Sequence, residues 1–376
     1  MNPRRNLVLV GAGHAHLHLA AHAQSFIRRG FHVLLIDPGN FWYSGMATGM
    51  LGGLYEPAED QLDACALIES QGGEFIQDRV EAVDANRRQL TLAGGDQLTY
   101  DYLSINVGSQ VNPEAFAGIA GDASVWAVKP ISNLYKLRRF IETRLQEGGV
   151  ALPLIVIGGG PTGCEVAANL AGLAERCKGA IHVTLITSGS RLIEQAPERA
   201  ARRLYRKLTQ RGIEIRTNTR IAARGVGILV TEAGESINAE CVVQATGLEA
   251  HPLAQNTGLP SDPKRGLRIN RNCRSISDSR IFAAGDCAAM EGYQLPKLGL
   301  FSVRQASCIH ANLIATMDAK PLRAYRPQTR YLTILNLGDG TGLAIRGSLW
   351  WHGRISLWLK DFIDRRFLGA YRRRCP

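Results

Sequence analysis

Two glycine-rich turns combine residue types and spacing that indicate chemistry. The first, Gly11-Ala12-Gly13-His14-Ala15-His16, follows an apolar run and precedes a helix-forming run. Backbone N–H groups in such a turn, together with a helix N-terminus, bind a pyrophosphate. Asp37 ends the next apolar run, where a carboxylate accepts hydrogen bonds from a ribose diol. These residues predict a bound dinucleotide, although His16 occupies the position of the third glycine.

The second turn lies about 147 residues further along and contains every glycine of the pattern. It reads Gly158-Gly159-Gly160-Pro161-Thr162-Gly163, and Cys164 and Glu165 begin the helix-forming run behind it. In each half a second strand, a crossover and a meander follow, and the half closes on a small residue and glycine, at Gly108 and Gly247. Because this order occurs twice, the sequence predicts two dinucleotide-binding units.

A third motif, Gly285-Asp286, follows the apolar run 280–284. A carboxylate at such a strand end can accept a hydrogen bond from a polyol hydroxyl. The run from Pro296 onward, which includes Lys297 and Gln305, predicts a helix. Its N-terminal dipole suits the N1–O2 edge of a flavin, which becomes anionic on reduction.

The elements that must position these motifs are alternating strands and helices. We expect meanders at 74–106 and 213–238, a basic helix ending near residue 145, and a helix at about 197–211. This pattern predicts an α/β fold with two Rossmann-like dinucleotide-binding domains, the second inserted in the first, and a small C-terminal α+β region. The expected boundaries are 1–125 and 265–322 for the two parts of the first domain, 126–264 for the second domain, and 323–376 for the C-terminal region.

The C-terminal region ends in a basic amphipathic segment. We expect a strand pair at 331–335 and 341–347, followed by a helix that begins near Arg354. Apolar side chains recur at helical spacing along it, namely Ile355, Trp358, Leu359, Phe362, Ile363, Phe367 and Tyr371, and Arg354, Asp361, Asp364, Arg365 and Arg372 lie toward the other side. Residues 349–376 are therefore predicted to bind an anionic membrane surface. The alternative is that the helix packs on the body of the protein or on a second copy in a homodimer.

Bulk composition narrows the class of protein. The 376 residues carry a net charge of +11, which indicates an anionic partner. Nucleic acid is disfavoured because no recognition fold accompanies the charge. The eight cysteines have no paired spacing, which argues against a disulfide framework or a zinc site. The first strand begins at about residue 6, which leaves no room for a signal peptide, and no apolar run approaches the roughly 20 residues of a membrane span.

Histidines and cysteines beside the motifs are candidate reactive groups. His14, His16, His18 and His22 are poorly spaced for a convergent metal site, so no metal is predicted, and contact of His14 or His16 with a phosphate is the better functional interpretation. Cys164 and Cys287 invite sulfide chemistry, but free cysteines next to glycine turns are more often buried packing residues.

These motifs together resemble the two-dinucleotide-binding-domain flavoproteins, which include the pyridine nucleotide–disulfide oxidoreductases. Within them the chain looks closest to type II NADH dehydrogenases and to the related module fused to selenide, water dikinase. The resemblance implies FAD on the first domain, held by Gly11, Ala12, Gly13, His14, Ala15, His16, Asp37, Val80, Gly108, Gly285 and Asp286. It implies NADH or NADPH on the second domain, held by Gly158, Gly160, Thr162, Gly163, Arg191 and Gly247.

The resemblance also implies catalytic residues. Glu165 matches the family position beside nicotinamide and flavin. Lys129 and Lys297 fall in segments expected near the flavin, where a lysine could stabilise the reduced flavin or pair with Glu165; ordinary surface lysines are the alternative. Gln305 is expected near the electron acceptor.

Two departures from the family pattern matter. Residues 39–54 lack the Cys-x-x-x-x-Cys of the disulfide members, so the flavin must pass its electrons elsewhere. Thr187 and Ser188 stand where NADH users carry a carboxylate, and Arg191 could accommodate the 2′-phosphate of NADPH.

The sequence therefore predicts an FAD-dependent oxidoreductase that passes a hydride from NAD(P)H to flavin and electrons on to a membrane quinone. Its predicted location is the cytoplasm, peripherally bound to the inner face of the cell membrane. One alternative is an enzyme similar to sulfide:quinone oxidoreductases, with a vestigial nicotinamide site. The other is a flavin-bound redox sensor or partner module linked to selenium metabolism.

Overall fold

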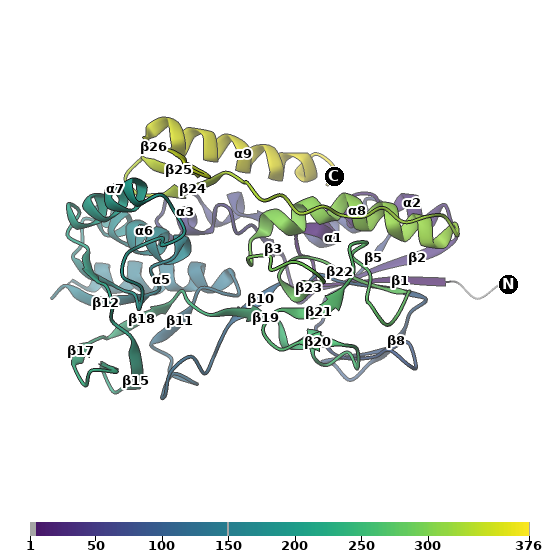
Figure 1. Cartoon of the computed structure of the whole chain (residues 1–376), viewed down its shortest axis with the longest axis horizontal. Helices are drawn as coiled ribbons and strands as arrows, with labels where there is room; N and C mark the ends of the chain where they lie inside the picture. The colour runs from purple at the N-terminus through teal and green to yellow at the C-terminus, as the bar shows by residue number, and fades with distance from the viewer. Residues whose placement is uncertain (1–4, 149, 376) are drawn as a thin grey trace.

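Two parallel five-stranded sheets form the framework of the protein. The computed structural model describes residues 5–148 and 150–375, and Figure 1 shows the two halves side by side. The first sheet has the order β22-β9-β1-β2-β5 and the second has the order β11-β18-β12-β13-β14. Both sheets are built from short apolar runs, which suit strands covered on both faces.

The first sheet contains β1 (Arg5–Val10), β2 (Phe31–Ile36), β5 (Glu74–Ile76), β9 (Tyr102–Ile105) and β22 (Ile281–Ala283). Strand β22 pairs in parallel with β9, although the whole second sheet lies between them in the chain. The prediction that the second domain is inserted in the first is therefore confirmed. Helices α1 (His14–Ala20), α2 (Gln24–Ile27), α4 (Ala64–Glu69) and α8 (Gly299–Met317) belong to this half.

The second sheet contains β11 (Val125–Ala127), β12 (Leu152–Ile157), β13 (Ile181–Ile186), β14 (Glu214–Arg216) and β18 (Cys241–Gln244). Its helices are α5 (Ser132–Glu147), α6 (Pro161–Cys177) and α7 (Glu198–Thr209). Each half also carries a meander, with β6 (Val80–Asp84), β7 (Gln89–Leu92) and β8 (Gln97–Thr99) in the first and β15 (Ile221–Gly225), β16 (Ile228–Thr231) and β17 (Ser236–Asn238) in the second. The predicted repeat of one architecture is thus present.

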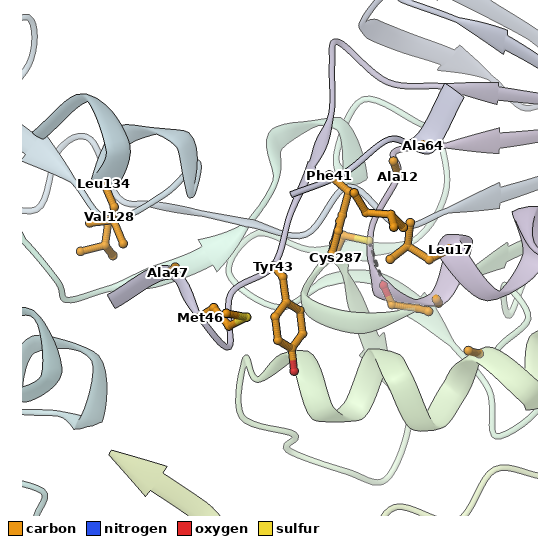
Figure 2. Close-up of a cluster of buried hydrophobic side chains, with 14 of the residues drawn as sticks. Ala12, Leu17, Phe41, Tyr43, Met46, Ala47, Ala64, Val128, Leu134 and Cys287 are labelled. Carbon is orange, nitrogen blue, oxygen red and sulfur yellow. Dashed lines mark hydrogen bonds between the residues drawn. The ribbon is translucent and has the colours of Figure 1, made fainter. Parts of the chain in front are cut away.

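Smaller elements complete the fold. They are β3 (Phe41–Trp42) with β4 (Gln61–Leu62), α3 (Ala47–Leu51), β10 (Ser109–Val111) with β19 (Leu248–Ala250), and β20 (Ser261–Asp262), β21 (Gly266–Ile269) and β23 (Ala288–Met290). Helix α3 packs against α5 and α6 of the second half. Short 3₁₀ turns occupy Pro57–Glu59, Pro252–Ala254 and Gly285–Cys287. Figure 2 shows part of the core that these elements enclose, with buried Phe41, Tyr43 and Met46 of the segment after β2 and Cys287 of the last turn.

The C-terminal region lies over both halves. After α8 the chain runs back alongside that helix to a three-stranded antiparallel sheet of β24 (Thr333–Asn336), β25 (Gly342–Arg346) and β26 (Leu349–Gly353) (Figure 1). Helix α9 (Arg354–Arg372) follows and caps this sheet. The sequence predicts the first two strands but not β26, because the tryptophans at 350 and 351 are equally typical of a segment at a membrane interface. None of the helices in the described ranges is long and apolar enough to cross a membrane.

Candidate active site

The first glycine turn is built around Asn106, which follows β9. A Cβ atom on Gly13 would lie 2.4 Å from the carbonyl oxygen of Asn106, so only glycine fits there. The side-chain Oδ1 of Asn106 accepts the N–H of Ala15 at 2.9 Å, and its Nδ2 donates to the carbonyl of Ala284 at 2.8 Å. Asn106 thereby fixes the start of α1 against the turn that precedes Asp286. Sequence reasoning did not assign it a role, although it lies in the 102–108 motif.

The same turn leaves donors and an acceptor for a dinucleotide. Among the described residues no acceptor is found for the N–H groups of Gly13 and His14. Asp37 accepts the N–H of Ala12 at 2.7 Å and that of Gly39 at 3.0 Å, one on each carboxylate oxygen. Burial raises the pKa of Asp37. A partly desolvated carboxylate beside free N–H groups fits a ribose and its pyrophosphate.

Contact with a phosphate was predicted for His14 or His16, and both ring nitrogens of His16 are engaged inside the protein. The ring is completely buried, its Nδ1 lies 2.6 Å from the carbonyl oxygen of Gly11, and its Nε2 lies 2.8 Å from Oγ of Ser104. Burial lowers the pKa of His16 to about 4, so the imidazole is neutral at neutral pH. Because both nitrogens are engaged, the ring connects the glycine turn to Ser104 of β9 and stabilises the turn.

His14 lies at the front of the turn, where α1 meets α8. A Cβ atom on Gly299 would lie 3.1 Å from its ring, and the ring of Phe41 packs edge-on at a centroid distance of 5.0 Å. Burial lowers the pKa of His14 to about 4, although nearby Asp286 opposes this shift. The neutral His14 side chain therefore stands between two helix N-termini that both suit an anionic group.

Asp286 is the charged centre of the first domain's second part. Its Oδ2 accepts the ammonium of Lys129 at 2.8 Å and the hydroxyl of Ser109 at 2.7 Å. Burial favours the neutral acid, but Lys129, the Ser109 hydroxyl and Lys297 together outweigh it and hold the pKa of Asp286 below its usual value. Oδ1 has no hydrogen-bond donor among the described residues, which suits a polyol hydroxyl.

The structure places both predicted lysines and Gln305 around Asp286, which corrects the pairing with Glu165 and leaves the predicted flavin contact of the lysines a prediction. Lys129 pairs with Asp286 instead of Glu165, and Lys297 donates to the backbone carbonyl of Asp286. Gln305 is buried, and its Oε1 accepts the N–H of Gly285 at 2.7 Å. It therefore holds the Gly285-Asp286 turn in place and does not reach an acceptor site.

The second glycine turn lies at a cavity of about 780 Å³, which we name the nucleotide pocket. A Cβ atom on Gly163 would lie 1.8 Å from the carbonyl oxygen of Gly158, which explains the glycine there. Gly160 faces open space at the N-terminus of α6. The walls of the nucleotide pocket include the loop 187–191, residues 193–196 and the C-terminal residues Thr333, Leu335 and Ile345.

The end of β13 carries hydroxyl groups in place of a carboxylate. The side chain of Thr187 packs beneath Gly159, where an added Cβ would lie 2.6 Å away. Arg191 lines the pocket and donates through Nη2 to the carbonyls of Glu194 and Ala196. Its Nη1 is buried and has no partner among the described residues.

Glu165 lies where α6 meets the C-terminal region. Its Oε1 accepts the N–H of Asn336 at 2.7 Å and the hydroxyl of Thr48 at 3.4 Å. Burial raises the pKa of Glu165, while the ammonium of Lys360 opposes the shift. The cation that faces Glu165 is thus on α9. Sequence reasoning missed Lys360 because it counted this residue only toward the basic charge of the tail.

A second cavity of about 540 Å³ lies on the other side of β24. Its walls include Leu300 and Arg304 of α8, Ile334 of β24, and Lys360, Ile363 and Asp364 of α9. Thr333 and Leu335 line the nucleotide pocket, whereas Ile334 between them lines this second cavity. Side chains alternate across a strand, so β24 divides the two cavities along its length, while Arg330 and Tyr331 before the strand line both of them. We name the second cavity the acceptor pocket.

Helix α9 buries two charged side chains and exposes several large apolar ones. It docks on the body through Leu357, Lys360, Asp364 and Leu368, and it leaves large apolar side chains in solvent. Ile355 and Trp358 are 74% and 66% exposed, Phe362 and Ile363 of the same helix are also exposed, and Leu349 and Trp351 of β26 extend this face. The prediction that Asp364 lies on the solvent side was wrong, because this carboxylate accepts hydrogen bonds inside the protein. Ile363 belongs both to this exposed apolar face and to the acceptor pocket.

Neither candidate cysteine has the character of a nucleophile. Cys164 and Cys287 are fully buried, and their thiols face backbone carbonyls. Burial raises the pKa of both thiols, that of Cys287 to about 11. A thiolate is needed for sulfur transfer, so the arrangement favours packing roles for both.

The remaining histidines form an aromatic cluster. His18, His22 and His310 lie with ring centroids 4.3 to 5.5 Å apart, and Oγ of Ser25 lies 2.9 Å from Nε2 of His310. Within residues 5–148 and 150–375, no group of three or more potential ligands is arranged to hold a metal ion.

Comparison with known proteins agrees with this architecture. A family model described as pyridine nucleotide-disulphide oxidoreductase matches residues 5–307. The chain is 26% identical to the type II NADH:quinone oxidoreductase of Haemophilus influenzae, over 90% of this chain and 86% of that protein. It is 28% identical to an NADH dehydrogenase-like protein of Mycobacterium tuberculosis, over 77% and 75%.

Solved structures show the same fold at lower identity. The structure of NDH2 from Plasmodium falciparum in complex with NADH matches with a TM-score of 0.83 at 15% identity, covering 98% of this chain and 97% of that one. The sulfide:quinone oxidoreductase of Aquifex aeolicus matches with a TM-score of 0.81 at 16% identity, covering 98% and 92%.

Proposed function

The chain belongs to the pyridine nucleotide-disulphide oxidoreductase family, whose members bind FAD and NAD(P)H, and we propose that it is an NAD(P)H:quinone oxidoreductase of this family. FAD, when bound, supplies the two-electron chemistry that joins a hydride donor to an acceptor. The chain's own residues bind and orient the two substrates and provide protons.

The observation that carries the proposal is the pair of pockets separated by β24. The nucleotide pocket lies at the α6 N-terminus, and the acceptor pocket lies on the opposite face of the strand. The wall residue Leu300 follows Gly299, which packs against the His14 ring at the predicted flavin site. The hydride donor and the electron acceptor can therefore each bind in a pocket of their own near the predicted flavin site.

The chemistry of the acceptor pocket favours a quinone. Leu300, Ile334 and Ile363 contribute apolar parts of its wall. Cations that could bind a carbonyl oxygen also line the pocket, namely Lys360, Arg304, Arg330 and Arg346. Because Ile363 also belongs to the exposed apolar face of α9, a lipid-soluble acceptor could enter from a membrane on which that face rests. The relatives named as quinone reductases support the same acceptor class.

The donor side supports NADH or NADPH. The free space at Gly160 admits a pyrophosphate. Glu165 accepts a hydrogen bond from the backbone N–H of Asn336, the last residue of β24. No carboxylate stands at Thr187 to select NADH by its ribose. We include NADPH as a substrate for this reason, with Arg191 close to the expected 2′ position.

Anaerobic double mixing tests the proposal. Oxidised holoenzyme is mixed first with NADH or NADPH and then with a short-chain ubiquinone, and flavin absorbance is followed. We expect rapid bleaching in the first step and rapid recovery in the second. Bleaching without recovery would reject the quinone as acceptor, and bleaching by sulfide alone would reject the nicotinamide as donor.

A further inference from the structure

A group of buried polar side chains lies beneath α9. Lys360 and Asp364 are one helical turn apart, their side chains are 11% and 7% exposed, and their Nζ and Oδ2 atoms lie 2.8 Å apart. Oδ1 of Asp364 accepts the hydroxyl of Tyr43 at 2.9 Å. Together with Asp60 these residues form what we call the α9 cluster.

Asp60 is the unusual member of the α9 cluster. It has no exposed surface, and neither carboxylate oxygen has a hydrogen-bond partner among the described residues. The carbonyl oxygen of Asp60 accepts the N–H of Tyr43 at 2.8 Å, which fixes the residue next to that side chain. A buried carboxylate that lacks donors is costly as an anion, so a proton on Asp60 is the stable arrangement.

The groups that face Asp60 support this protonation state. Tyr43 faces it from the segment after β2, and Lys360, Asp364 and Arg372 face it from α9. Arg372 donates to the carbonyls of residues 58, 59 and 61, so its guanidinium is occupied by backbone. Burial raises the pKa of Asp60 to about 8; Asp364 adds to this shift, and Lys360 and Arg372 oppose it. The ammonium of Lys360 thus balances the charge of Asp364, and Asp60 stays neutral.

The α9 cluster is continuous with the acceptor pocket. Lys360 and Asp364 are part of the pocket wall, while Asp60 is enclosed behind them. Gly45 permits this close approach, because a Cβ atom there would lie 2.8 Å from Oδ1 of Asp364 and 2.5 Å from the Tyr43 ring. A buried acid therefore lies within electrostatic range of two side chains of the acceptor pocket wall.

We propose that Asp60 stores a proton for acceptor reduction and that this proton replaces the one that Lys360 gives up at the acceptor pocket. This inference rests on the proposed function. Reduction of a quinone to a quinol consumes two electrons and two protons, and NAD(P)H provides both electrons and one proton as a hydride. The second proton leaves the Lys360 ammonium for a quinone oxygen. The O–H bond of Asp60 then breaks, Lys360 regains its N–H bond, and solvent later returns the proton to Asp60.

The test combines a spectroscopic and a kinetic measurement. Infrared spectra of the holoenzyme with carboxyl-labelled aspartate, recorded over a pH titration, report protonated aspartates directly. Asp60→Asn is compared with Asp63→Asn, a matched amide substitution three residues away at an exposed helix N-cap that asparagine also satisfies. Double mixing then measures flavin reduction and flavin reoxidation separately for each variant.

We expect wild-type protein to show a protonated aspartate at neutral pH that disappears in Asp60→Asn and persists in Asp63→Asn. Asp60→Asn should slow reoxidation by quinone by about 100-fold, the lower range for loss of a positioned proton donor, and flatten its pH profile. Reduction by NAD(P)H should be unchanged.

Two results would overturn the inference. One is the absence, in wild-type protein, of any aspartate that titrates well above its ordinary range, a readout that does not depend on how Asp60→Asn folds. The other is quinone reoxidation of Asp60→Asn with the rate and pH profile of wild type. If quinone does not reoxidise the flavin of the wild-type protein, the proposed function is overturned. The proposal that the proton on Asp60 serves acceptor reduction then fails as well.

Discussion

The ammonium of Lys129 lies 2.8 Å from Oδ2 of Asp286, and the two residues come from different halves of the protein. Lys129 follows β11 of the second sheet, and Asp286 follows β22 of the first. Their side chains are only 21% and 9% exposed. The ion pair therefore joins the two domains at the position predicted for the ribityl chain of FAD.

Lys129→Met should destabilise the protein strongly, because it leaves the buried Asp286 carboxylate without its cation. We expect the free energy of unfolding to fall by about 3–5 kcal/mol, measured by urea titration, together with weaker retention of FAD. Arg87→Met removes the cation of an exposed pair with Asp84 and should cost less than about 1 kcal/mol. Equal losses in the two variants would show that the buried Lys129 pair stabilises the protein no more than an exposed pair does.

The exposed apolar face of α9 should carry membrane binding. The double variant Ile355→Asp with Trp358→Asp removes two large side chains from this face, each worth about 1.5–3 kcal/mol when buried. We therefore expect at least about a tenfold loss of binding in flotation assays with vesicles that contain phosphatidylglycerol.

Val226→Asp is the control, because Val226 is fully exposed in the turn between β15 and β16, away from α9. It should bind as wild type does. Unchanged binding of the double variant would contradict the membrane role. A wild-type dimer that the double variant dissociates would identify the face as a contact between two copies.

The protonated state of Asp60 also predicts how stability depends on pH. Its folded-state pKa is raised to about 8, above the value of about 3.9 for an unfolded aspartate, so the folded state binds the proton more tightly. This contribution is present at low pH and is lost as the pH rises through about 8. Urea titrations at about pH 5 and about pH 9 should show a smaller loss for Asp60→Asn than for wild type or Asp63→Asn. Parallel losses in all three proteins would contradict the assignment.

The choice between NADH and NADPH should depend on the end of β13. Thr187→Asp introduces a carboxylate of nearly the same size where a ribose hydroxyl is expected. We expect the ratio of kcat/KM for NADH to that for NADPH to rise by about tenfold or more, since one anionic partner attracts the diol and repels the phosphate. Thr209→Asp, on the exposed end of α7, should leave the ratio unchanged. A ratio that does not move in Thr187→Asp would place the 2′ position elsewhere.

The motifs that could be predicted are those in which neighbouring residues set the geometry. There is no room for a side chain at Gly13 or Gly163. Such turns can be recognised in a sequence because the strand, the turn and the helix are consecutive. The insertion of the second domain was also predictable, because the repeated order of elements is a property of the chain itself.

The parts that escaped prediction depend on contacts between distant segments. His16 fills a third-glycine position but binds Ser104 across the first sheet, and Gln305 turns toward Gly285. Lys360 and Asp364 are buried only because α9 folds back over Tyr43 and Gly45, more than 300 residues earlier in the chain. Helical periodicity alone placed Asp364 with the exposed charges, since it cannot tell which face of an amphipathic helix docks.

The central claim is that β24 separates a donor pocket from an acceptor pocket, and two neighbouring substitutions test it most directly. Ile334→Trp fills the acceptor pocket, and Thr333→Trp fills the nucleotide pocket from the other face of the same strand. In anaerobic double mixing, Ile334→Trp should keep the wild-type rate of flavin reduction by NAD(P)H, and its rate of reoxidation by quinone should fall by about tenfold or more. Thr333→Trp should show slower flavin reduction by NAD(P)H. When its flavin is reduced with dithionite instead, quinone should reoxidise it at the wild-type rate. If both variants impaired the same half-reaction, or neither impaired any, the two-pocket account would be contradicted.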